Sequence, residues 1–212
     1  MVSLKSLIQR MYPYGIFRVG TAVYLTFDDG PIPEVTPQLL EILDRYGVKA
    51  TFFMVGENIE KHPEVFEQVV KGGHSIGNHT YNHLKGWDTP LEEYMANVAK
   101  WEEAFSRQYS EVRGQKSDGS RMLFRPPYGK ITLKQRIALH KKGYQIYYWD
   151  VLTQDYNATK SPEWMLKRIQ RETRPGSIIN FHDSLKSNER MLEVMPKVIE
   201  WLQAEGYELK AL

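Results

Sequence analysis

Segments typical of strands and segments typical of helices alternate along almost the whole chain. The expected strands are 22–26, 48–55, 74–79, 123–124, 145–149, 177–181 and 207–209. The expected helices are 34–46, 63–71, 90–108, 131–142, 162–171 and 188–204. Such alternation indicates parallel strands joined by right-handed helical crossovers. It predicts an α/β fold, either a barrel or a distorted version of one, with an open doubly wound sheet as the alternative.

The length of 212 residues predicts one folded domain, here taken as residues 21–212. The polar, Gly- and Ser-containing residues 106–121 are interpreted as an exposed connection within that domain. Residues 1–20 are expected to form an N-terminal helical extension, because Leu4, Leu7, Ile8 and Met11 fall at helical spacing.

The first twenty residues lack the continuous apolar core and small-residue cleavage site of a secretory signal. No apolar run approaches the length of a transmembrane helix. These features predict a cytoplasmic protein, with peripheral membrane association and an unrecognised export route left open.

Charge and cysteine content exclude several classes of function. The 28 basic and 26 acidic residues nearly cancel, so nothing indicates nucleic acid as a partner. The absence of cysteine excludes disulfides, thiol catalysis and thiolate metal sites. A transition metal would therefore have to be held by His, Asp or Glu.

Polar clusters follow five of the expected strands. Barrels of this kind carry their sites on the loops after the strands. The clusters are Asp28-Asp29, His79 to His83, Arg125 to Tyr128, Trp149-Asp150 through Asp155-Tyr156, and His182-Asp183. Their repeated placement at strand ends predicts one composite site.

The stretch Asp28-Asp29-Gly30-Pro31 could by itself be an ordinary turn. Adjacent side chains at a strand end point in different directions, however, so one carboxylate can hold a metal while its neighbour moves a proton. His79 and His83 are four residues apart, a spacing that lets two imidazoles face one point. A catalytic zinc-like site needs a third ligand, which Asp28 or Asp29 could supply.

Five motifs together resemble those of the polysaccharide deacetylases, also called carbohydrate esterase family four or the NodB-homology domain. They are Thr26-Phe27-Asp28-Asp29-Gly30-Pro31, His79-x-x-x-His83, Arg125-x-Pro127-Tyr128, Asp155-Tyr156 and Ile178-x-x-x-His182-Asp183. The resemblance spans roughly residues 22–212. It implies a distorted seven-unit (β/α) barrel and metal-dependent removal of acetyl groups from sugars.

The resemblance also implies roles for individual residues. The metal ligands are expected to be Asp29, His79 and His83. Asp28 resembles the general base that acts on metal-bound water, and His182 the general acid for the leaving group. Three further residues complete the expected catalytic set: Arg125 and Asp155 as the pair that positions and tunes the base, and Tyr128 as the residue whose backbone N–H holds the oxyanion.

Three positions depart from the family pattern. Leu152 and Tyr156 stand where the fourth motif usually has Asp and Trp, and Asn180 stands where the fifth usually has Leu. The family's Leu and Trp resemble the wall that receives the acetyl methyl. The residues expected to contact the substrate are Tyr128, Tyr156 and Asn180. At position 180, Asn replaces an apolar wall residue of the expected acyl pocket with a polar side chain.

The leading hypothesis is a metal-dependent hydrolase that removes N-acetyl groups from an amino-sugar glycan similar to chito-oligosaccharide or peptidoglycan. Two alternatives are an O-acetyl esterase acting on a glycan such as xylan and a catalytically silent carbohydrate-binding domain. The expected cofactor is a divalent metal, with Zn²⁺ favoured and Co²⁺ or Ni²⁺ compatible with the same ligands. The expected partner is an acetylated carbohydrate, and the oligomeric state is left open.

Overall fold

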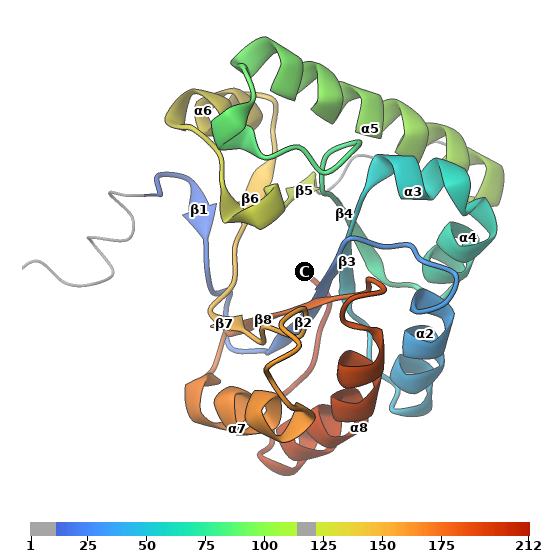
Figure 1. Ribbon diagram of the computed structural model, residues 1–212, viewed down its shortest axis with the longest axis vertical. Helices are drawn as coiled ribbons and strands as arrows, with labels where there is room; N and C mark the ends of the chain where they lie inside the picture. The colour runs from blue at the N-terminus through green and yellow to red at the C-terminus, as the bar shows by residue number, and fades with distance from the viewer. Residues whose placement is uncertain (1–11, 114–121) are drawn as a thin grey trace, which may run out of the picture.

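The protein is a curled sheet of parallel strands surrounded by helices (Figure 1). The computed structural model describes residues 12–113 and 122–212. The strand order across the sheet is β1-β6-β5-β4-β3-β2-β8-β7, and every strand pair is parallel. The strands are β1 Gly15–Ile16, β2 Tyr24–Asp28, β3 Thr51–Met54, β4 Ser75–Asn78, β5 Leu123–Phe124, β6 Gln145–Tyr147, β7 Val151–Leu152 and β8 Ile178–His182.

The helices lie outside the ring of strands (Figure 1). They are α2 Thr36–Arg45, α3 Gly56–Lys61, α4 Pro63–Lys71, α5 Leu91–Arg113, α6 Leu133–Lys141, α7 Pro162–Glu172 and α8 Asn188–Ala204. Two short 3₁₀ helices, η1 Gly86–Asp88 and η2 Pro127–Gly129, lie in the loops that follow β4 and β5.

One extended stretch, residues 145–152, brings the two sides of the curled sheet together. Its first part, β6, pairs with β5 and β1, whereas its second part, β7, pairs with β8. Arg18, just after β1, adds an antiparallel bridge to Ser177. The distorted barrel expected from the sequence is therefore confirmed, and the open doubly wound sheet is not observed.

The central strand β2 shows how the sheet separates two apolar regions. All five of its residues are buried, and they alternate between the two faces. Leu25 and Phe27 pack outward against the helices, whereas Tyr24 packs inside the ring. By the same alternation Thr26 and Asp28 point inward, and Asp28 lies at the carboxyl end of the strand.

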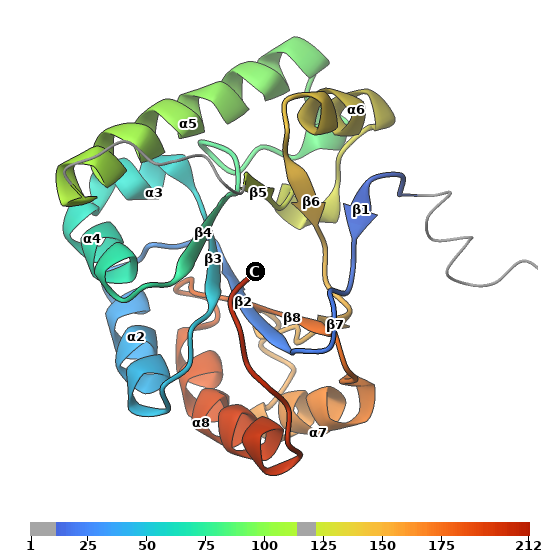
Figure 2. The ribbon, with the colours of Figure 1, turned by 180° about the vertical axis from the view of Figure 1, so that it is seen from behind.

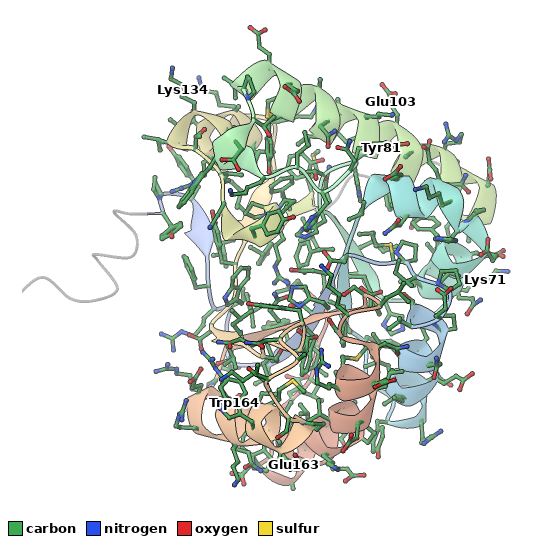
Figure 3. The ribbon with its side chains drawn as sticks, viewed as in Figure 1. Lys71, Tyr81, Glu103, Lys134, Glu163 and Trp164 are labelled. Carbon is green, nitrogen blue, oxygen red and sulfur yellow. The ribbon has the colours of Figure 1, made fainter. Side chains whose placement is uncertain are left out.

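The opposite end of the ring is filled by residues from the end of the chain. Leu212 packs against Tyr24, Phe53 and other inward-facing side chains. Its N–H donates to Thr51 Oγ1 at 2.9 Å, and its carbonyl accepts from Ser75 Oγ at 2.9 Å. Figure 2 shows this segment rising from α8 and ending near the middle of the ring, on the side away from the viewer of Figure 1. Side chains fill the interior throughout (Figure 3).

Several expected boundaries are wrong. Helix α5 continues to Arg113, so residues 106–113, the first half of the expected connection, are helical. Tyr109 and Val112 pack against the core, and Arg113 Nη2 donates to the Val70 carbonyl at 3.0 Å. The expected strand 207–209 forms only an isolated bridge between Leu209 and Val23. Strands β1 and β7 and helix α3 were not expected, since segments of two to six residues carry too little periodicity to be recognised.

The helix expected from Leu4, Leu7, Ile8 and Met11 falls outside the described residues. Strand β1 lies in the later part of the expected N-terminal extension and pairs with β6. Within residues 12–113 and 122–212, no helix is long and apolar enough to cross a membrane.

Candidate active site

The two adjacent carboxylates at the end of β2 point to different partners. Asp28, the last residue of the strand, is buried and turned toward Arg125. Asp29 adopts a φ of 86°, which turns the chain and directs its side chain toward two histidines. The expected separation of the two carboxylates is therefore present in the fold.

Asp183 holds the turn that follows these carboxylates. Its Oδ1 accepts from Gly30 N at 3.0 Å, and its Oδ2 accepts from Thr36 Oγ1 at 2.7 Å. A Cβ at position 30 would lie 2.0 Å from Asp183 Oδ2, so only glycine fits there. Burial raises the pKa of Asp183 to about 8, against the opposing effect of the Thr36 and Gly30 hydrogen bonds.

His79 and His83 lie on the loop after β4. His79 is buried, and its Nδ1 donates to the Arg125 carbonyl at 2.7 Å, which leaves Nε2 free to face Asp29. A hydrogen bond of this kind fixes the tautomer and orientation of a metal-binding imidazole. Burial lowers the pKa of His79 to about 4, so the ring is neutral near pH 7 and able to bind a cation.

Two asparagines hold the loop between these histidines. Thr80 has a φ of 63°, and its N–H donates to Asn78 Oδ1 at 2.8 Å. Asn97, on α5, accepts from the N–H of Tyr81 at 2.7 Å; Tyr81 is labelled in Figure 3. The loop is therefore tied both to the strand below it and to the helix beside it.

The side chains of Asp29, His79 and His83 converge on one point. Asp29 Oδ1 lies 3.2 Å from His83 Nε2 and 3.7 Å from His79 Nε2. Two ligands at ~2.1 Å from a tetrahedral ion lie about 3.4 Å apart, so these spacings fit zinc-type coordination. Asp29 Oδ1 is buried and has no hydrogen-bond partner of good geometry. A carboxylate oxygen beside two imidazole nitrogens is a donor set suited to a divalent cation.

The pKa of Asp29 reflects the same surroundings. Burial raises it, but the contact with His83 and the charges of His182 and His79 together hold it well below its usual range. The carboxylate is thus ionised at neutral pH, as a metal ligand must be.

Arg125 lies inside the ring beneath the carboxylates. Its Nη1 donates to Asp28 Oδ1 at 2.7 Å, to Thr26 Oγ1 at 2.8 Å and to Asn180 Oδ1 at 2.7 Å. Its Nη2 donates to the Tyr148 carbonyl at 3.0 Å, and its guanidinium lies 4.1 Å from the Phe53 ring centroid. The guanidinium is thereby fixed, and it fixes Asp28 in turn.

Asp155 does not pair with Arg125, contrary to the expectation that the two would act on the base together. It binds His182 instead: its Oδ2 accepts from the His182 N–H at 2.7 Å, and its Oδ1 accepts from Nδ1 at 2.8 Å. Burial lowers the pKa of His182, but Asp155 raises it more strongly, and the resulting pKa is about 9. The expected pair is thus divided, with Arg125 on Asp28 and Asp155 on His182.

Asp28 and His182 face each other across neighbouring parallel strands. They are direct register partners at the carboxyl ends of β2 and β8. Adjacent strands are about 4.8 Å apart. This register places a carboxylate and an imidazole side by side at the carboxyl ends of the two strands.

Two exposed tyrosines flank the cluster. The Tyr128 ring lies 4.6 Å from the His83 ring, and the Tyr156 ring lies 5.1 Å from the His182 ring. Tyr128 has a φ of 59° in η2. Leu152 pairs with Asn180 in the sheet, and the buried Asn180 amide oxygen is engaged by Arg125. All residues expected in the site, from all five motifs, are therefore brought to one end of the ring.

Comparison with known proteins agrees with this arrangement. The polysaccharide deacetylase family model matches residues 18–147, more than half of the chain. The chain belongs to the polysaccharide deacetylase family. The resemblance recognised in the sequence is thus confirmed.

Named relatives of this deacetylase-family chain include a peptidoglycan-N-acetylglucosamine deacetylase of Bacillus cereus, 32% identical over 87% of this chain and 83% of the relative. A chitooligosaccharide deacetylase of Azorhizobium caulinodans is also 32% identical, over 91% of this chain and 93% of the relative. The crystal structure of the Bc1960 peptidoglycan N-acetylglucosamine deacetylase superposes with a TM-score of 0.87 at 31% identity, covering 99% of this chain and 95% of that one.

Some supporting residues of the site were not predicted from the sequence. Asp183 belongs to the fifth motif, but the sequence assigned it no role. Its position directly after His182 was the feature that could have identified it. Asn78 and Asn97 carried no recognisable signal, because their contribution depends on contacts between the loop, the strand and α5.

Proposed function

We propose that this protein is a metal-dependent N-deacetylase of glycans that contain N-acetylglucosamine. The observation that carries the proposal is the convergence of Asp29 Oδ1 with the two histidine Nε2 atoms, at the strand ends where Asp28 and His182 are register partners. The names of the relatives support the reaction, since they are deacetylases of peptidoglycan and chitooligosaccharide. They do not favour an O-acetyl esterase or a silent binding domain.

Asp29, His79 and His83 would hold the divalent cation, and the ion would supply Lewis acidity that activates water and polarises the acetyl carbonyl. Asp28 is proposed to accept the proton of the attacking water. A general base must lie within hydrogen-bond reach of the proton that it removes. Arg125 fixes Asp28 directly before Asp29, and the charge of Asp28 acts on the His79 ring.

His182 is proposed to donate a proton to the departing amide nitrogen of the sugar. An amine leaves readily only when protonated, and the pKa of about 9 keeps His182 protonated near neutrality. The backbone N–H of Tyr128 is proposed to stabilise the oxyanion that develops on the acetyl oxygen. In this scheme Arg125 orients the base and Asp155 orients the acid.

Tyr128 and Tyr156 are proposed to border the sugar ring at the deacetylation site. Both rings are substantially exposed, and each lies against one of the site's histidines. Aromatic side chains combine an apolar face with a polar end, which suits a ring that carries both C–H and O–H groups.

Removal of the metal is expected to abolish deacetylation without unfolding the protein. The Asp, His, His donor set suits zinc, and Co²⁺ or Ni²⁺ fit the same ligands. The measurement is acetate release from chito-oligosaccharides before and after chelation, followed by titration with each ion. Circular dichroism should show unchanged secondary structure, since the ring has an extensive apolar core of its own. Full activity in rigorously metal-free protein would refute the metal-dependent mechanism.

Asn180→Leu is expected to reduce kcat by about tenfold with little change in KM. The substitution removes an acceptor from the buried Arg125 guanidinium, and a hydrogen bond to a charged group contributes about 1.5–3 kcal/mol. Arg125 would then hold Asp28 less firmly. Steady-state kinetics on acetylated chito-oligosaccharides measure both constants. A rise in turnover would instead support the alternative in which position 180 serves only as an apolar wall for the acetyl methyl.

A further inference from the structure

We infer that Trp87 forms an additional sugar-binding position, beyond the deacetylation site, for a second part of a longer glycan chain. The inference rests on the proposed function, because it extends the same binding surface. It assigns a ligand, a pyranose ring several units along the glycan, to a residue that belongs to none of the five motifs.

Three exposed aromatic side chains lie on loops at the carboxyl end of the strands. They are Trp87 after β4, Tyr128 after β5 and Tyr156 after β7, with exposed fractions of 57%, 58% and 46%. Large aromatic rings are usually buried, and several of them exposed on one rim mark a binding surface. Tyr128 lies against His83 and Tyr156 lies against His182, so Trp87 is the member that the proposed reaction leaves without a role.

Trp87 is connected to the site by two chain segments that run side by side. The segments begin at His83 and Tyr128, whose rings are 4.6 Å apart. They end where Gly86 N donates to the Lys130 carbonyl at 2.9 Å and Trp87 Nε1 donates to the Ile131 carbonyl at 3.2 Å. Four residues of chain span at most ~14 Å, so Trp87 lies within the length of a short oligosaccharide from the metal cluster.

The indole is held in place before any ligand arrives. Its Nε1 is bonded to the Ile131 carbonyl, and Lys130 Nζ lies 5.1 Å from its ring centroid. Gly86 permits this close packing, since a Cβ there would lie 2.6 Å from Gln135 Oε1 and 2.7 Å from the Lys130 carbonyl. A ring that is already ordered loses little conformational freedom when it binds a ligand, which favours affinity. The neighbouring ammonium group adds a hydrogen-bond donor for sugar hydroxyls.

The test compares short and long substrates. With metal-loaded enzyme, Trp87→Ala is expected to raise KM for the chitin hexamer by about tenfold while leaving kcat unchanged. The same variant should leave the kinetics of the chitin dimer unaltered, because the dimer does not reach position 87. Trp87→Phe keeps an aromatic face but removes the Nε1 hydrogen bond, so it should retain most of the hexamer affinity. Leu133→Ala, an exposed apolar residue of α6, is the control and should behave like the wild type.

Two results would overturn the inference. Equal effects of Trp87→Ala on dimer and hexamer would show that the residue only supports the loop, and no effect on either would show that it does not bind sugar. Calorimetric binding of the hexamer to Asp28→Asn protein, with and without Trp87→Ala, provides a reading that needs no turnover. If the wild type deacetylates no sugar, the proposed function fails; if hexamer binding is then also independent of Trp87, the inference fails separately.

Discussion

Asp28→Asn is expected to reduce turnover by about 10²–10⁴-fold while changing metal affinity by less than about tenfold. Asp28 bonds to Arg125 and is not one of the three residues whose ligand atoms converge, so the substitution removes the proposed proton acceptor but none of the proposed metal ligands. Asn retains a carbonyl oxygen for Arg125, which limits the disturbance to the buried guanidinium. Deacetylation kinetics and calorimetric titration with Zn²⁺ measure the two effects independently.

Asp29→Asn should give the opposite pattern and reduce metal affinity by at least ~100-fold. Loss of a residue that only contacts a metal ligand typically lowers metal affinity by about 10–100-fold, and loss of a direct ligand is expected to lower it more. Asp88→Asn is the matched control, since Asp88 is an exposed carboxylate that pairs only with Lys85 among the described residues. Equal losses of metal affinity in the Asp28 and Asp29 variants would contradict the proposed division of roles.

Asp155→Asn is expected to lower kcat by about 10²-fold and to move the alkaline limb of the pH profile toward lower pH. In the wild type, activity that needs protonated His182 should persist up to a pH of about 9, since Asp155 raises the pKa of His182 to about that value against the opposing effect of burial. Removing the carboxylate charge lowers this pKa by about 1–3 units, so the protonated fraction falls at a correspondingly lower pH.

The geometry adds a second effect to this variant. Asp155 accepts two hydrogen bonds from His182, at the backbone N–H and at Nδ1, whereas Asn has one acceptor oxygen. One of the two donors must therefore face an amide NH₂ group. The kcat–pH profiles of wild type and variant provide the measurement. An unchanged alkaline limb would mean that His182 is not the group whose protonation limits the reaction.

The Asp29, His79 and His83 cluster and the fold class could be predicted from the sequence. The four-residue spacing of the two histidines and the strand–helix alternation are local patterns, but these left Asp28 and Asp29 open as the third ligand, and the family resemblance selected Asp29. Each of these features results from periodicity or from the placement of polar residues after apolar ones.

The partners of Arg125 and Asp155 could not be predicted, because they depend on where the ring closes. Residues 145–147 pair with β5, whereas residues 151–152 pair with β8, and after this change of partner Asp155 bonds to His182. The two-residue strand β7 that makes this change has too few residues to show a period. Likewise, Asn180 looks like a substituted wall residue in the sequence, whereas the structure shows its oxygen on the Arg125 guanidinium.

The register between β2 and β8 makes the separation of Asp28 from His182 independent of the loops. The backbone ladder, in which Asp183 N also donates to the Asp28 carbonyl at 3.0 Å, sets that spacing. Loops such as residues 84–90 and 156–160 could therefore be exchanged among relatives as modules. Grafted loops would change which glycans are accepted while the interval between Asp28 and His182, the proposed proton acceptor and donor, stays constant. This makes the chain a suitable scaffold for redirecting specificity by loop transplantation.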